Sequence, residues 1–417
     1  MVRGMGSQKV AQKTIHKAVP KMYVWTGAKA IAEAVKLADV DVITAYPIRP
    51  YTGVMNALAK MIADGEFTSE IIVVDSEHSQ FEAAKHASAV GARTFVGSSG
   101  VGLSYASEAI VVTAVGQLPV VALAGCRALD DPGNFGMEWN DVLMFRDLGW
   151  LMSWAKNPQE ALDMTLVAYR VSEDHRVLLP HFVAVDGATV THISTPVEPP
   201  NKEQVTEFLP PYKPPYPLDP SYGPITKAQH IAPSLIGPEQ RKIVDVAMKN
   251  AKEVIREAWS DYSRYVGREY PPFIETEHME DAEVALVTMG AYAKDAMYVA
   301  GKLRKEGVKV GIVRLRYFRP FPDEELRETL NGVKAAGIVD FSYSNGSPDS
   351  SGVLFNEVRS TLYENDSRPS LMDFMFVGGR EPSVTHFEHA IRLLQRSVET
   401  GKVEKRIRWL TLRGEDV

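Results

Sequence analysis

VDVITAYPIRPYTG, residues 40–53, is the stretch that decides the first half of the fold. The run from Val40 to Ile43 is apolar except for Asp41, and it predicts a strand. Two prolines follow, and a helical pattern begins near Gly53. Because parallel sheets present their binding loops at the carboxyl ends of strands, the turn after this strand is the first candidate for a functional loop.

The same alternation of apolar runs and amphipathic stretches continues as far as Gly187. Strands are predicted at residues 40–46, 70–75, 93–97, 118–124 and 176–186, and helices at 28–37, 53–62, 78–90, 105–115 and 158–173. Apolar runs that do not alternate with polar residues suit strands that are covered on both faces. The first half is therefore predicted to be an α/β domain with a mainly parallel sheet.

A second unit of the same kind begins near residue 283. Its predicted strands are 285–289, 309–313, 335–341 and 371–377, and its predicted helices are 291–306, 323–331, 352–363 and 383–399. Between the units, PPYKPPYP at Pro210–Pro217 can form neither a helix nor a central strand. It is predicted to be an extended tether, with an arm across a partner subunit as the alternative, and a charged helical stretch follows at 238–263. The expected division is a flexible arm 1–26, a first domain 27–194, a Pro-rich linker with a helical segment 195–282, and a second domain 283–417.

The composition excludes several classes of site. A formal net charge of −7 disfavours a nucleic-acid groove or an anionic membrane surface. The uncharged run Ala109–Cys126 contains Gly-Gln-Leu-Pro, which interrupts a membrane span. The N-terminal segment is basic without a long apolar core, so a cytoplasmic location is expected. The single cysteine, Cys126, excludes an internal disulfide and an all-cysteine iron–sulfur cluster in this chain, and it is expected to be a small buried hydrophobe.

Six short motifs follow one another along the chain. They are Tyr46-Pro-Ile-Arg-Pro50, Ser76-Glu-His-Ser79, Ser98-Ser-Gly-Val-Gly-Leu103, Arg127-Ala128, Arg319-Pro-Phe-Pro322 and Gly378-Gly-Arg380. Together they resemble the alpha subunits of the 2-oxoacid:ferredoxin oxidoreductases, which use thiamine diphosphate. The resemblance implies two doubly wound, mainly parallel α/β domains, the first thiamine pyrimidine-binding-like and the second transketolase-C-terminal-like.

Glu77 is the residue that this resemblance makes catalytic. An acid at a helix N-terminus is by itself only a favourable capping residue. In the family, a carboxylate in this Ser-Glu context hydrogen-bonds the aminopyrimidine ring of the cofactor and so favours proton removal from the thiazolium carbon. The resemblance also implies cofactor contacts from Pro47, Ile48, Ser99 and Gly102, although a glycine-rich turn alone is weak evidence.

Two departures from the family pattern concern the substrate. The variable position of Tyr-Pro-Ile-x-Pro is usually a small hydroxyl residue, and here it is Arg49, which is costly unless it meets an anion. Arg127 matches a substrate-binding arginine of the family. The glycines, proline and acids after it predict a mobile loop whose Asp130 approaches the reacting centre, with a solvated turn as the alternative. The expected substrate-loop residues are Tyr46, Asp131, Phe135, Gly136 and Met137.

These features make oxalate the expected substrate. Arg49 and Arg127 would pair with the dianion, and the complex would cleave oxalate to two CO₂ through a thiamine diphosphate adduct, passing two electrons to ferredoxin. One alternative is the oxidation of pyruvate or another 2-oxoacid with coenzyme A, in which Arg49 binds the substrate carboxylate. The other is a non-catalytic scaffold subunit with a degenerate thiamine fold.

The resemblance also implies partner subunits. The family usually binds Mg²⁺ with Gly-Asp-Gly and a later Asn, and Asp186-Gly187 lacks the leading glycine. The histidines show no paired metal-ligand spacing, so no metal site is expected in this chain. A beta-type subunit is expected to hold Mg²⁺ and the diphosphate. Partner subunits, including a gamma-type subunit, are expected to carry the [4Fe–4S] clusters that reduce ferredoxin.

Overall fold

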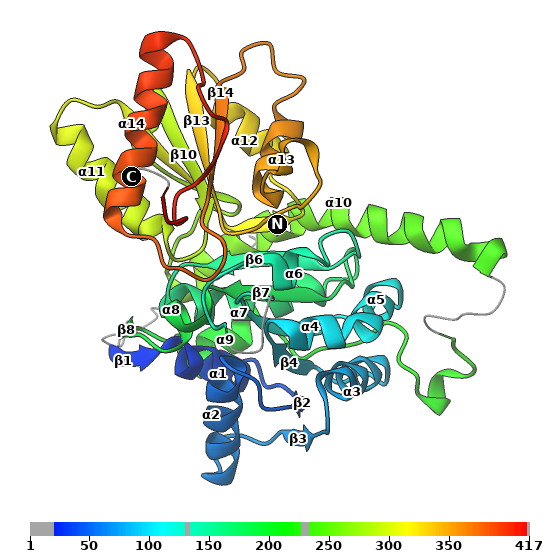
Figure 1. The fold of residues 1–417 in the computed structure, drawn as a ribbon. Helices are drawn as coiled ribbons and strands as arrows, with labels where there is room; N and C mark the ends of the chain where they lie inside the picture. The colour runs from blue at the N-terminus through cyan, green and yellow to red at the C-terminus, as the bar shows by residue number, and fades with distance from the viewer. Residues whose placement is uncertain (1–20, 130–133, 227–232, 415–417) are drawn as a thin grey trace, which may run out of the picture.

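Two α/β lobes stand one on the other in the computed structural model, which describes residues 21–129, 134–226 and 233–414 (Figure 1). The first lobe is built on a seven-stranded sheet of order β12-β6-β7-β5-β4-β2-β3, in which all neighbours are parallel except β12 and β6. Its strands are β2 Val42–Ala45, β3 Glu70–Val73, β4 Thr94–Ser98, β5 Val121–Gly125, β6 Leu151–Ala155, β7 His181–Val185 and β12 Tyr317–Arg319.

Helices α1 to α8 belong to this lobe. They are α1 Gly27–Leu37, α2 Tyr51–Ala63, α3 Glu77–Ala89, α4 Val101–Tyr105, α5 Ser107–Val115, α6 Asn140–Leu143, α7 Pro158–Ser172 and α8 Gly187–Thr191. Helix α1 packs against α2 and α7, and α3 packs against α4 and α5. Thr26, Ser76 and Asn157 cap α1, α3 and α7 by accepting a hydrogen bond from a backbone N–H of the first turn.

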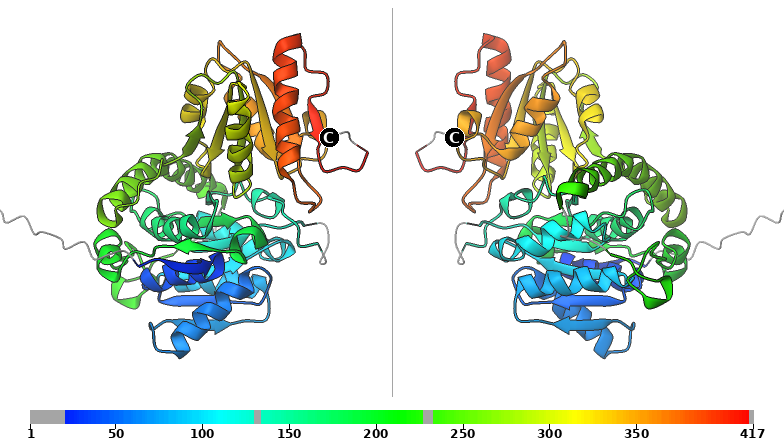
Figure 2. Two further views of the ribbon diagram at one scale, coloured as in Figure 1. Left: turned by 90° about the vertical axis from the view of Figure 1, so that its left-hand side faces the viewer. Right: turned by 90° about the vertical axis from the view of Figure 1, so that its right-hand side faces the viewer.

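The second lobe repeats this plan on a six-stranded sheet of order β15-β14-β13-β10-β11-β9, in which only the β9 and β11 pair is antiparallel (Figure 2). Its strands are β9 Ile274–Glu277, β10 Val284–Met289, β11 Val310–Leu315, β13 Ala335–Asp340, β14 Ser370–Met375 and β15 Ile407–Trp409. Its helices are α11 Ala293–Lys305, α12 Asp323–Thr329, η2 Pro348–Ser350, α13 Val353–Thr361 and α14 Val384–Thr400. The prediction of two mainly parallel α/β domains is confirmed.

The outer segments differ in detail from the expected boundaries. Strand β1, Tyr23–Thr26, lies within the segment predicted to be a flexible arm, and it pairs antiparallel with β8, Ser194–Val197. Such a pairing of remote segments has no local signal in the sequence. Helix α9, Lys202–Phe208, begins in a capping box formed by Asn201 and Gln204, so the linker region carries regular structure of its own.

The Pro-rich segment lies against the first lobe. The Leu218 N–H donates to the oxygen of Ala89 at 2.8 Å, and a Cβ on Gly91 would lie 2.9 Å from Pro214. After η1, Pro220–Tyr222, the long helix α10, Pro233–Val266, runs between the two lobes. It packs on α5, α7 and α9 and forms ion pairs with the acidic first turn of α12.

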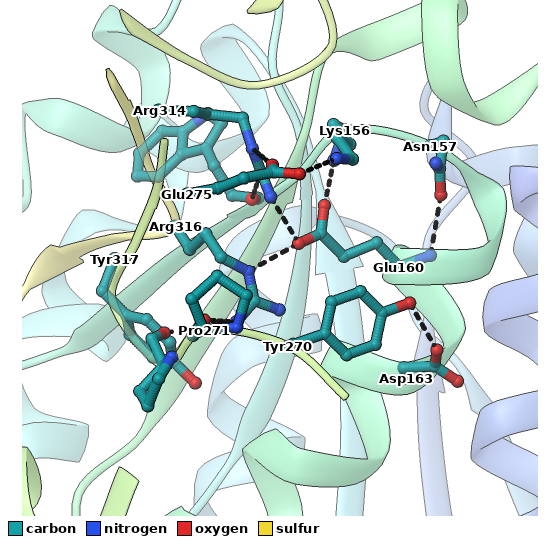
Figure 3. Close-up of polar contacts among 12 residues, drawn as sticks. Lys156, Asn157, Glu160, Asp163, Tyr270, Pro271, Glu275, Arg314, Arg316 and Tyr317 are labelled. Atoms are coloured by element: carbon teal, nitrogen blue, oxygen red, sulfur yellow. Dashed lines mark hydrogen bonds and ion pairs between the residues drawn. The ribbon is translucent and has the colours of Figure 1, made fainter. Parts of the chain in front are cut away.

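Glu160 of α7 ties the second domain to the first. Its Oε1 accepts hydrogen bonds of 2.7 Å from both Arg314 and Arg316, and all three side chains are buried (Figure 3). Burial alone would raise the pKa of Glu160, but the two guanidinium groups lower it to about 2. The Arg316 guanidinium also lies over the rings of Trp259 and Tyr270, at 4.2 and 4.8 Å. This cluster joins α7, α10 and the end of β11 into one unit.

Within the described residues, no helix has both the length and the apolar character needed to cross a membrane.

Candidate cofactor and substrate site

The predicted site residues lie at one edge of the first sheet. Strands β5, β4, β2 and β3 are neighbours in that order and all run parallel. Their carboxyl ends lead directly into the segments that carry Arg127, Ser99, Ile48 and Glu77 respectively. The topology therefore gathers motifs from four strands at the edge where parallel sheets place their binding loops.

Glu77 is the first residue of α3, directly after its cap Ser76, and it is only 8% exposed. The residues around Glu77 can be described from Gly102 in α4, which lies next to it. A Cβ on Gly102 would lie 2.6 Å from Glu77 Oε1, 2.7 Å from Ile48 Cδ1 and 2.7 Å from Ser98 Oγ. Three segments thus converge on one glycine, at a position where even a methyl group would clash with its neighbours.

The loop Tyr46–Pro50 is held at its C-terminal end. Pro50 is buried and packs on the end of β5, where a Cβ on Gly125 would lie 2.4 Å from its ring. Ser99, also buried, donates a hydrogen bond of 2.5 Å from Oγ to the backbone oxygen of Arg49. Ser99 therefore holds the loop that carries Arg49. Tyr46 and Ile48 are half-buried, and Pro47 is exposed at the surface.

The two arginines flank the turn formed by Ser99 and Gly100. The Arg49 side chain is exposed and makes no ion pair with any other residue in the described ranges. Arg127 is buried, and a Cβ on Gly100 would lie 2.6 Å from its Nε. Its guanidinium lies 5.0 Å from the ring centroid of Phe135. The backbone of an exposed arginine and the side chain of a buried one thus lie at the same turn.

Asp141 is a buried residue of the candidate site that the sequence did not indicate. Its Oδ2 accepts hydrogen bonds from the backbone N–H of Gly100, at 2.8 Å, and of Arg127, at 3.1 Å. Burial raises the pKa of Asp141 to about 7, although these N–H groups oppose the shift. It sits on the four-residue helix α6 with no motif around it, and only the tertiary structure shows that it fixes Arg127 relative to the turn.

The predicted substrate loop is only partly within the described residues. Asp130 and Asp131 lie outside them, so their roles remain predictions. Phe135 is 53% exposed, whereas Met137 is buried in the core. A Cβ on Gly136 would lie 2.1 Å from the oxygen of Gly379 in the second lobe. Asn134 and Gly136 therefore contact the second domain, and the mobility of the loop 130–137 remains a prediction.

Other polar groups near the sheet edge have structural partners. Asp186 accepts a hydrogen bond from Trp139 Nε1 at 3.1 Å and another from the backbone N–H of Ala291, and burial raises its pKa to about 6. Cys126 is buried, as expected, and desolvation raises the pKa of its thiol. In the described part of the chain, one exposed cluster with metal-ligand atoms within 4.8 Å consists of His78, Glu82 and Glu108. An exposed cluster of this kind does not by itself indicate a metal ion.

Comparisons with known families and structures agree with this arrangement. The family described as pyruvate flavodoxin/ferredoxin oxidoreductase, thiamine diP-bdg, matches residues 33–260. The family described as pyruvate:ferredoxin oxidoreductase core domain II matches residues 282–387. Among solved structures, the 2-oxoglutarate:ferredoxin oxidoreductase of Magnetococcus marinus superposes with a TM-score of 0.68 at 16% identity, over 90% of this chain and 65% of that chain. A split-gene transketolase has a TM-score of 0.52 at 12% identity, over 92% of this chain and 99% of that chain. These two structures support the fold.

Related proteins match this chain over almost the whole length of both sequences. The pyruvate synthase subunit PorA of Pyrococcus abyssi is 39% identical over 399 residues, which cover 95% of this chain and 100% of that protein. The ketoisovalerate oxidoreductase subunit VorA of Pyrococcus horikoshii is 36% identical over 395 residues, which cover 94% of this chain and 99% of that protein. Both names refer to enzymes of 2-oxoacids, so they favour that alternative over the expected oxalate specificity. With its thiamine-binding domain and these relatives, the chain belongs to the 2-oxoacid:ferredoxin oxidoreductases, as an alpha-type subunit of a multi-subunit enzyme.

Proposed function

We propose that this chain supplies the pyrimidine-side half of a thiamine diphosphate site in a complex that oxidises a small 2-oxoacid and reduces ferredoxin. The observation that carries this proposal is the convergence of Glu77, Ile48 and Gly102. A buried carboxylate stands there beside an apolar side chain, and the missing side chain of the glycine lets both approach its backbone closely. An aminopyrimidine ring fits that combination, because it needs one hydrogen-bonding carboxyl group and an apolar contact for its face.

When bound, thiamine diphosphate supplies a nucleophilic carbon and an electron sink for decarboxylation. Glu77 would hydrogen-bond the aminopyrimidine ring and hold it at a fixed distance from α3. Ile48 would contact the ring face, and Ser99 keeps the Tyr46–Pro50 loop in place through its bond to the Arg49 oxygen. Each of these side chains is held by an element of the first sheet, which suits a preorganised site.

The substrate carboxylate would be bound by the two arginines. Arg127 is fixed by its backbone bond to Asp141, and its guanidinium presents a planar set of donors that matches a carboxylate. Arg49 is exposed at the mouth of the site and could reach the same anion. For a 2-oxoacid such as pyruvate, the substrate named for the PorA relative, the carboxylate leaves as CO₂ and coenzyme A would accept the remaining acyl group.

Oxalate is the second candidate, and the observation that favours it is the pair of arginines. The backbone of Arg49 is tied to Ser99, and the Arg127 side chain packs on Gly100, so both cations flank one short turn. Two guanidinium groups compensate a dianion better than a monoanion, and a dianion is a poor electrophile until its charge is offset. Oxalate would give two CO₂ and two electrons without an acyl acceptor.

Partner subunits complete the proposal. The single cysteine of this chain is buried, and Asp186 is engaged by Trp139 and Ala291. The [4Fe–4S] clusters, the Mg²⁺ ion and the diphosphate contacts are therefore assigned to beta-type and gamma-type partners, from which ferredoxin takes the electrons. A cytoplasmic location, where such a complex meets ferredoxin, is part of the same proposal.

Anaerobic reduction of methyl viologen by the chain purified with its native partners tests the proposal. Pyruvate or oxalate is supplied, each with and without coenzyme A. Reduction that requires a 2-oxoacid and coenzyme A would support the first candidate. Reduction by oxalate that ignores coenzyme A would support the second. A fully assembled, cofactor-loaded complex that reduces viologen with none of a panel of short 2-oxoacids, nor with oxalate, would contradict both.

A further inference from the structure

A turn of the second domain contacts the loop that follows Arg127. The backbone N–H of Gly378 donates a hydrogen bond of 2.5 Å to Oε1 of Glu138, whose side chain is buried. One residue later, the Trp139 N–H donates to the oxygen of Phe341 at 2.9 Å. We refer to the contact between residues 134–138 and the Gly378–Gly379 turn as the interdomain latch.

The latch is a close approach of two backbones. A Cβ on Gly136 would lie 2.1 Å from the oxygen and 2.2 Å from the Cα of Gly379. In the opposite direction, a Cβ on Gly379 would lie 2.3 Å from Oδ1 of Asn134, which itself accepts from the Gly136 N–H at 3.0 Å. Contacts this short exist only because both positions are glycine, so the sequence specifies the docking from both sides.

The latch also sets the position of an aromatic ring. Phe135 lies between Asn134 and Gly136, the two residues held by the second domain, and its ring centroid is 5.0 Å from the Arg127 guanidinium. The Gly136 oxygen accepts a bond of 2.9 Å from the N–H of Ala128, the residue after Arg127. The loop therefore closes back on the arginine, and the ring lies against the cation at a half-exposed position.

We propose that the Gly378–Gly379 turn positions Phe135 against Arg127 and thereby sets the affinity of the complex for its anionic substrate. Gly136 and Glu138 are positioning residues in this arrangement. The second domain then takes part in substrate binding, although it contributes no side chain to the sheet edge where the site lies. The inference rests on the proposed function of Arg127 as a carboxylate ligand. A loop ordered before binding loses less entropy when the substrate arrives, which is why the latch acts on affinity.

Gly136→Ala in the assembled complex is the direct test, because its Cβ meets the Gly379 backbone. The matched control is Gly301→Ala in α11, where a Cβ meets nothing within 4 Å. We expect Gly136→Ala to raise KM for the substrate by about tenfold with kcat within twofold, and to raise by the same factor the Kd of oxamate, an unreactive analogue of both acids, in calorimetry. The Gly301→Ala complex should have the same KM for the substrate and the same Kd for oxamate as the parent complex.

A double-mutant cycle tests whether Gly136 affects substrate affinity through the Phe135 ring. Phe135→Ala should raise KM as Gly136→Ala does, and the combination should add no further increase. If the two effects multiply, or if Gly136→Ala leaves KM and Kd within twofold, the proposal is wrong. Should Gly136→Ala fail to assemble, Gly379→Ala displaces Asn134 from the other side, and Gly401→Ala supplies a control with a similar positive φ in open space.

The results that would contradict this inference differ from those that would contradict the proposed function. An Arg127→Ala complex with unchanged KM and unchanged oxamate Kd would remove the arginine from substrate binding and overturn the proposed function. If Arg127→Ala raises both values while Gly136→Ala and Gly379→Ala raise neither, Arg127 binds substrate and the interdomain latch has no part in it.

Discussion

Glu77 and Gly102 approach each other so closely that a Cβ on the glycine would lie 2.6 Å from Oε1 of the carboxylate. The two residues come from the loops after β3 and β4, which are not adjacent in the sheet, since β2 lies between them. Ile48, from the loop after β2, completes the group at 2.7 Å from the same point. Segments that follow three different strands thus meet at Gly102, and the cofactor proposal depends on this convergence.

Gly102→Ala is expected to weaken thiamine diphosphate binding. The added methyl group must displace Glu77 or Ile48, at a cost of about 1–3 kcal/mol, which corresponds to roughly 5- to 150-fold in Kd. Titration of the cofactor-depleted complex with thiamine diphosphate measures this. Gly301→Ala is the control. An unchanged Kd would mean that the cofactor does not lie beside Gly102.

Glu77→Gln is expected to abolish turnover without preventing assembly. A carboxyl group that exchanges a proton with the cofactor contributes on the order of 10²- to 10⁴-fold to the rate, and an amide cannot replace it. Viologen reduction by the assembled complex gives the loss in kcat. Glu82→Gln, on the same helix, alters a partly exposed ion pair with Lys85 and should leave kcat nearly unchanged. Near-native activity of the Glu77→Gln complex would instead favour the scaffold alternative.

Local sequence predicted many elements well because most central strands are short, largely apolar segments. The predicted strand at 335–341 and the observed β13, Ala335–Asp340, differ by one residue, and helix 158–173 corresponds to α7, Pro158–Ser172. Strands β1, β6, β8, β9, β12 and β15 were missed. β12 shows why: it follows the second domain's β11 in the sequence yet pairs with β6 of the first, so only the tertiary contact makes it a strand.

The same limit applies to the site. Ile48, Glu77, Ser99 and Gly102 lie on family motifs, and the parallel topology brings their loops to one edge of the sheet. No sequence motif marks Asp141 as a residue of the site. The glycines and proline of residues 130–137 predicted a mobile loop, but glycine also permits a close backbone contact. Gly136 shows the second use, because its contact with Gly379 spans more than half of the chain and has no local trace in the sequence.

Arg49→Thr restores the small hydroxyl residue that is usual in the family and separates the two candidate substrates. If oxalate is the substrate, leaving its second carboxylate unpaired should cost about 3 kcal/mol, or roughly 100-fold in kcat/KM. Turnover of pyruvate with coenzyme A should then rise. The control is Arg392→Thr, an exposed arginine paired with Glu306. Near-native oxalate turnover by the Arg49→Thr complex would exclude Arg49 as the selectivity residue.

Glu160→Gln is expected to destabilise the junction of the two domains in a pH-dependent way. The pKa of Glu160 is about 2 in the folded chain, against an ordinary 4.5. A carboxyl group whose pKa is lowered on folding contributes stability that is fully present above about pH 4.5 and is lost as the pH falls toward 2. The difference between the two pKa values of Glu160 corresponds to about 3 kcal/mol of folding free energy. The Gln variant lacks this titration. Its melting temperature in the complex should therefore lie several degrees below that of the parent at pH 7, and this difference should narrow below pH 4.5.

The control is Glu257→Gln, which breaks a partly exposed pair with Arg176 and should change the melting temperature little at either pH. A gap of equal size at pH 7 and pH 3 would show that the two arginines do not stabilise the ionised form of Glu160.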